Sequence, residues 1–180
     1  FVGVNKLFHL GLSQKELMER AVKVGADVPY CIMRGTALAE GIGEKLTALP
    51  PVPPCYVLIG KPAVSVSTKM AYENLNLETI KKHPDIDGMI LDIENGNLKK
   101  MTEKMANVFE PGIIREYPVI QEIKDFMEEK GALRAMMSGS GPTVFGIFDD
   151  REKMERAAEG LRAGELAKTV FATEVFNRRV

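Results

Sequence analysis

The apolar and polar positions of the first fifty residues predict a helix followed by a hairpin. Ser13 and Glu16 have the spacing of a capping box, which favours a helix over 14–24 that Gly25 ends. The segment 36–49 contains two short runs around a glycine turn, which indicates a β-hairpin. Apolar residues also share one helical face in 1–10 without a preceding N-cap, so we expect there the second half of a helix.

The remainder of the chain follows a proline-rich stretch at 50–54, the only linker-like composition in the sequence. We therefore expect a domain boundary there, between 1–50 and 51–180. The hydrophobic pattern then predicts strands at 55–60, 133–137, 143–148 and 167–176, and helices at 67–75, 85–96, 97–109, 118–131 and 151–161. Without the extra helices the order is β-α-β-β-α-β, so the pattern predicts an α+β fold with a ferredoxin-like (split βαβ) second domain.

Composition and charge exclude several classes of partner. The 180 residues carry a net charge of −1, which provides no field to hold nucleic acid or an anionic membrane. No apolar run is long enough to cross a membrane, and Lys6 and His9 interrupt any signal peptide. We expect a cytoplasmic protein that binds small molecules.

The histidines and cysteines do not predict a metal site. His9 and His83 lack a second ligand at metal spacing, and Cys31 and Cys55 form no CxxC pattern. We interpret both cysteines as small buried hydrophobic residues in a reducing compartment.

Bare backbone separates the two apolar runs of "MMSGSGPTVFGIF". Ser138, Gly139, Ser140 and Gly141 precede a proline, which is compatible with a flexible hairpin turn. The same composition is compatible with a loop whose exposed N–H groups bind an anion such as phosphate.

Asp27 is a candidate general base. Pro29 restricts Val28 to extended conformations, so we expect Asp27 on a rigid corner, where a carboxylate could accept a proton from a substrate hydroxyl. The alternative is a turn aspartate that bonds its own backbone.

Thr68 and Tyr72 project from one face of a predicted helix because they are four residues apart. A hydroxyl beside an aromatic ring can bind and stack a flat heterocycle. The alternative is a helix N-cap and a tyrosine in the core.

Three stretches carry a resemblance to a known family: "LGLSQKELMERAVKVGADVPYCIMRGTALAEGIGEKLTAL", "KPAVSVSTKMAY" and "MSGSGPTVFGIF". In this order and at these separations they resemble the 4-diphosphocytidyl-2-C-methyl-D-erythritol kinases. That family belongs to a superfamily of small-molecule kinases with galactokinase, homoserine kinase and mevalonate kinase. The resemblance covers essentially the whole chain.

The resemblance implies ATP-dependent phosphorylation, with Mg²⁺, of the 2-hydroxyl of 4-diphosphocytidyl-2-C-methyl-D-erythritol in non-mevalonate isoprenoid biosynthesis. It implies that Asp27 is the catalytic carboxylate, that Thr68 and Tyr72 face the cytidine, and that the loop 138–141 lies near the phosphates. Residues 1–50 would be the remainder of an ATP-binding domain, and 51–180 the ferredoxin-like C-terminal domain.

The sequence departs from the family in one respect, because it contains neither the family's catalytic lysine nor its Gly/Ser-rich phosphate loop. We therefore expect residues 1–180 alone to lack kinase activity. Two alternatives remain at this point. One is another kinase of the superfamily, acting on homoserine or a sugar, and the other is a non-catalytic ferredoxin-like module that binds a ligand.

Overall fold

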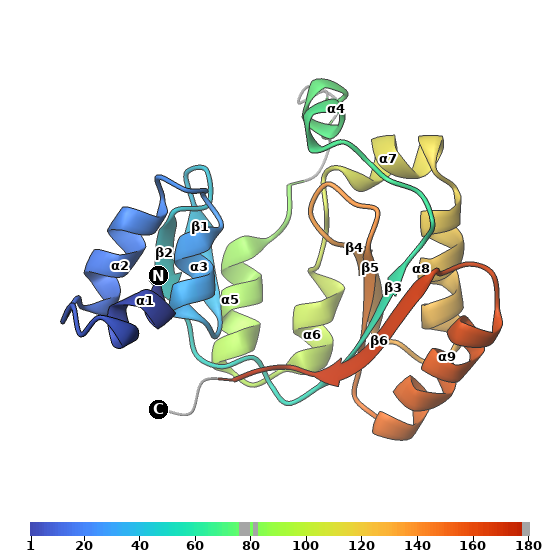
Figure 1. Ribbon diagram of the computed structural model, residues 1–180. Coiled ribbons are helices and arrows are strands. Elements are labelled where there is room, and N and C mark those ends of the chain that lie inside the picture. The colour runs from blue at the N-terminus through green and yellow to red at the C-terminus, as the bar shows by residue number, and fades with distance from the viewer. Residues whose placement is uncertain (76–79, 81–82, 178–180) are drawn as a thin grey trace. The chain divides into compact units, whose positions relative to one another are not determined.

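The computed structural model describes residues 1–75, 80 and 83–177 (Figure 1). The chain forms two compact units. The first contains Phe1–Val52 and the C-terminal residues from Phe176 on, and the second contains Pro53–Val175. Each unit is described by itself below.

The first unit combines short helices with a hairpin: α1 (Val2–Leu7), α2 (Gln14–Ala21), α3 (Val28–Met33), β1 (Ala37–Glu40) and β2 (Lys45–Ala48). The predicted capping box is confirmed, because the Ser13 side chain accepts from the Glu16 N–H and the Glu16 side chain from the Ser13 N–H. The predicted hairpin is also confirmed, with an antiparallel register from Ala37↔Ala48 to Glu40↔Lys45.

Two local predictions in this unit are wrong. Val28 is not extended but begins α3, because Pro29 occupies the first turn, where its missing N–H costs no helical hydrogen bond. Cys31 is exposed, whereas Cys55 is buried as expected. The short helix α3 buries only Pro29 among its described residues, so Cys31 remains on its open side.

The second unit contains a four-stranded antiparallel sheet in the described residues, in the order β4-β5-β3-β6. The strands are β3 (Tyr56–Lys61), β4 (Arg134–Met137), β5 (Val144–Phe148) and β6 (Thr169–Glu174). This order, with α8 (Val119–Glu129) before β4 and α9 (Arg151–Ala163) between β5 and β6, is the ferredoxin-like arrangement. The predicted α+β fold class is confirmed.

The core of this unit lies between the sheet and the helices α8 and α9, which cover one of its faces (Figure 1). Both helices are amphipathic, and their buried residues recur at helical spacing: Ile120, Ile123 and Met127 on α8, and Met154, Ala157 and Leu161 on α9. A Cβ at Gly60 of β3 would lie 2.9 Å from Leu161 and 3.1 Å from Met127. Glycine therefore lets both helices approach the central strand.

Four further helices connect β3 to α8: α4 (Thr68–Glu73), α5 (Ile86–Glu94), α6 (Leu98–Glu103) and α7 (Glu110–Glu116), counted over the described residues. The helix predicted over 97–109 is therefore too long, because α6 ends at Glu103, and α7 was not predicted. Among the described residues, no helix combines the length and the apolar character needed to cross a membrane.

Candidate functional site

The loop between β4 and β5 leaves backbone donors unpaired. The loop, here called the glycine loop, comprises residues 138–142. Inside it, the Ser138 N–H donates to the Thr143 carbonyl at 2.7 Å and the Gly141 N–H to the Ser138 carbonyl at 2.9 Å. Within the described residues, the N–H groups of Gly139 and Ser140 have no hydrogen-bond partner. Adjacent free N–H groups of this kind form anion-binding nests in other proteins.

Positive φ angles explain the glycines of this loop. The φ angle is +55° at Gly139 and +85° at Gly141, in the region that favours glycine. A Cβ at Gly139 would meet nothing within 4 Å, so this edge of the loop is open. At Gly141 a Cβ would lie 2.6 Å from the Met137 sulfur.

Helix α4 begins beside the glycine loop. Ser67 is its N-cap and accepts a hydrogen bond from the Met70 N–H, which leaves the Thr68 hydroxyl available. The Thr68 Oγ1 lies 3.1 Å from the Ser140 Oγ. Two predicted site residues, from segments far apart in the sequence, are therefore in contact.

Tyr72 lies one turn further along α4 and is 63% exposed, so the alternative of a core tyrosine is wrong. Its ring meets that of Phe109 edge to face, with centroids 5.0 Å apart. One face of the ring thus has a supporting neighbour, while most of its surface is open to a ligand.

Asp27 lies in the first unit, at the N-cap position of α3. Within the described residues its side chain makes no capping hydrogen bond, so the turn-aspartate alternative is not supported. A Cβ at Gly43, in the hairpin turn, would lie 3.7 Å from its Oδ1. The carboxylate is therefore held near a glycine turn and has a free oxygen.

Residues that the sequence did not indicate hold the glycine loop in place. Asn107 donates from its side-chain amide to the Met137 and Gly139 carbonyls, each at 2.8 Å. The Glu110 carboxylate accepts from the Met137 N–H at 2.7 Å and from the Lys124 ammonium at 2.8 Å. The sequence does contain a weak signal, because "NVFEPG" combines an Asn turn with a proline that begins a helix.

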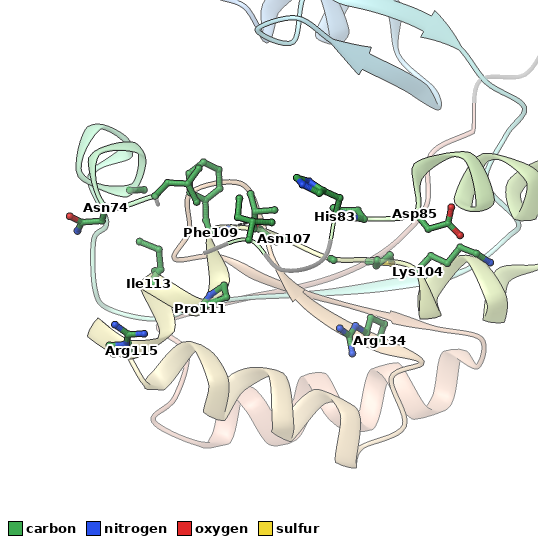
Figure 2. A pocket seen from close by; sticks show the side chains of 18 of the residues that line it. Asn74, His83, Asp85, Lys104, Asn107, Phe109, Pro111, Ile113, Arg115 and Arg134 are labelled. Carbon is green, nitrogen blue, oxygen red and sulfur yellow. Dashed lines mark hydrogen bonds between the residues drawn. The ribbon is translucent and has the colours of Figure 1, made fainter. Parts of the chain in front are cut away.

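A cavity of about 930 Å³ lies in the second unit, between α4 and the connection that joins α6 to α7 (Figure 2). Its lining includes Asn107 and Phe109 but none of the site residues predicted from the sequence. The Lys104 ammonium in its wall donates to the Asp92 carboxylate, and this bond raises the pKa of Lys104. No cluster of three or more metal-ligating side chains occurs in the described part of the chain.

Comparison with known proteins identifies the second unit. Residues 89–165 match the family described as "GHMP kinases C terminal". The chain contains a GHMP kinase C-terminal domain. The kinase domain so identified includes α8, β4, the glycine loop and β5.

Relatives over nearly the whole chain bear one name. The chain is 54% identical over 174 residues to a 4-diphosphocytidyl-2-C-methyl-D-erythritol kinase of Lachnospira eligens, covering 97% of this chain and 60% of that protein. It is 51% identical over 177 residues to a protein of the same name from Lachnoclostridium phytofermentans, covering 98% and 61%. The resemblance predicted from the sequence is confirmed, and the chain spans about 60% of the length of these curated relatives.

Solved structures agree with the kinase fold. A crystal structure of 4-(cytidine 5'-diphospho)-2C-methyl-D-erythritol kinase superimposes with a TM-score of 0.79 at 26% identity, covering 96% of this chain and 60% of that one. A homoserine kinase from Cytophaga hutchinsonii superimposes with a TM-score of 0.74 at 21% identity, covering 96% and 60%. The second similarity concerns the fold alone.

Proposed function

We propose that the complete protein containing this chain transfers the γ-phosphoryl group of ATP to the 2-hydroxyl of 4-diphosphocytidyl-2-C-methyl-D-erythritol, in non-mevalonate isoprenoid biosynthesis. The observation that carries this proposal is the 54% identity, over 97% of the chain, to a kinase of that name. The protein then acts in the cytoplasm on small molecules. Residues 1–50 belong to the ATP-binding domain, and 51–180 form the C-terminal domain.

The residues of this chain have distinct parts in the proposed reaction. The free N–H groups of Gly139 and Ser140 bind phosphate oxygens, as the open edge of the loop allows. The substrate hydroxyl oxygen attacks the γ-phosphorus, the bond to the ADP oxygen breaks, and the hydroxyl proton passes to the Asp27 carboxylate.

Mg²⁺ neutralises charge on the phosphates in reactions of this class. The described residues contain no cluster of metal-ligating side chains. This donor set fits an ion held mainly by phosphate oxygens and water rather than by a protein cage.

Thr68 and Tyr72 bind the cytidine in this proposal. The Tyr72 ring is exposed and supported at its edge by Phe109, a geometry that suits stacking against a pyrimidine. Homoserine and simple sugars carry no base, so this arrangement favours the cytidine substrate over theirs.

A kinase assay of the complete protein, with 4-diphosphocytidyl-2-C-methyl-D-erythritol, homoserine and galactose as acceptors, tests the proposal. Tyr72→Ala should raise KM for the cytidine substrate about 5- to 150-fold, from roughly 1–3 kcal/mol per stacked base, and leave KM for ATP unchanged. Tyr72→Phe, which keeps the ring, is the matched control and should be nearly silent.

Preference for homoserine or galactose would contradict the proposal in favour of another kinase of the superfamily. Binding of the cytidine compound without any phosphoryl transfer would indicate a non-catalytic module.

A further inference from the structure

The connection between α6 and α7 reaches the glycine loop through one side chain. Both side-chain N–H groups of Asn107 are used, one on the Met137 carbonyl and one on the Gly139 carbonyl. Its Oδ1 accepts from the Phe109 N–H at 2.9 Å. All three bonds require the amide in one orientation, and only a residue with two donors and an acceptor can make them.

A buried ion pair holds the same peptide group of β4 from its other side. The Glu110 carboxylate accepts from the Met137 N–H, and its second oxygen accepts from Lys124. The side chains of Lys124 and Glu110 are only 10% and 13% exposed. Asn107 and Glu110, here called the main-chain clamp, therefore fix both the C=O and the N–H of Met137, the last residue of β4.

The loop itself contains little that would fix its shape. Apart from the bond from Ser138 to Thr143, the described residues supply one internal backbone bond, from Gly141 to Ser138. Glycines at two of its positions give the unconstrained chain access to many conformations. The contact from Asn107 to the Gly139 carbonyl is thus the one that orients the peptide whose N–H belongs to Ser140.

We propose that Asn107 is a positioning residue for phosphoryl transfer, which holds the glycine loop so that the Gly139 and Ser140 N–H groups stay free for phosphate oxygens. The proposal rests on the proposed function for the phosphate itself. The hold on the loop is a property of this chain and can be measured without any substrate.

The test uses Asn107→Asp, which keeps the size and the acceptor for Phe109 but removes both donors. Asn97→Asp is the matched control, because Asn97 caps α6 only by accepting from the Lys100 N–H, at 3.1 Å, which aspartate also does. Amide hydrogen exchange on residues 1–180 should accelerate at least about tenfold at Ser138 and Gly141 in Asn107→Asp. It should not change in β5 or in the control.

Kinetics of the complete protein provide the second measurement. Asn107→Asp should lower kcat for phosphoryl transfer about 10²-fold, the cost typical of a small misplacement of reacting groups, with KM for the alcohol substrate little changed. Unchanged exchange in the loop would overturn the proposal, and so would accelerated exchange with a normal kcat.

A purely structural role predicts a different pattern. Exchange would then accelerate in β5 as strongly as in the loop, both in Asn107→Asp and in the uncharged variant Asn107→Ala, and that pattern would overturn the proposal. Failure of the wild-type protein to phosphorylate the cytidine substrate would refute the proposed function alone. The exchange measurement would then still decide whether Asn107 holds the loop.

Discussion

Replacing Gly141 by alanine tests whether the glycine loop tolerates a side chain at its tightest point. The φ angle of +85° at this position costs a non-glycine residue about 1–2 kcal/mol. The new Cβ would lie 2.6 Å from the sulfur of Met137. Met137 is fully buried, so its displacement costs a further ~1–3 kcal/mol. Gly141→Ala should therefore lower the free energy of unfolding by about 2–5 kcal/mol.

Gly139→Ala is the control for backbone strain alone. Its φ of +55° is also positive, but a Cβ there meets nothing within 4 Å, so the expected loss is only about 1–2 kcal/mol. Urea unfolding followed by far-UV circular dichroism gives both values by linear extrapolation. Equal losses for the two variants would refute the argument that the Met137 contact limits the loop.

A double-mutant cycle isolates the contact itself. Met137→Ala removes the sulfur that the new methyl group would meet. Combined with Gly141→Ala, it should destabilise by about 0.5–3 kcal/mol less than the sum of the two single variants. Strict additivity would show that the strain lies only in the backbone.

Three further predictions concern charged groups. In the complete protein, Asp27→Asn should keep the fold and lower turnover at least ~10²-fold, and near-normal turnover would exclude Asp27 as the general base. Lys124→Met should cost about 3–5 kcal/mol in urea unfolding, because it leaves the Glu110 carboxylate buried without its cation, and a neutral result would contradict the buried pair. The Asp92 carboxylate raises the pKa of Lys104 above 10.5, so the stability that wild type gains over Lys104→Met should be constant below pH 10.5 and fall as pH rises through the raised value. A pH-independent difference in unfolding free energy between these two proteins would contradict that hydrogen bond.

Most elements could be predicted because their local signals agree with their tertiary environment. The capping box at Ser13 and the apolar run of β3 specify their elements from neighbouring residues alone. Helix α7 has no such signal, since Pro111 and Gly112 are weak helix formers. Burial of Ile113 and the pairing of Glu110 with Lys124 decide its conformation. Both depend on contacts that no sequence window contains.

The same distinction applies to the site. The composition of the glycine loop indicates a bare backbone, but its contact with Thr68 spans 72 positions and needs the assembled sheet. Asn107 was placed in a predicted helix, where its side chain would have had no special orientation. The early end of α6 turns it toward the loop, and that end depends on packing rather than on local sequence.

The main-chain clamp touches only backbone atoms of Met137 and Gly139. Backbone partners persist when the side chain that they carry is exchanged, so the clamp places no chemical demand on the residue types of the segment that it grips. A combinatorial library could vary Met136 and Ser138 freely while the anchoring geometry is conserved. Positions 110 and 124, by contrast, would have to be varied together, as an acid with a base or as two apolar residues.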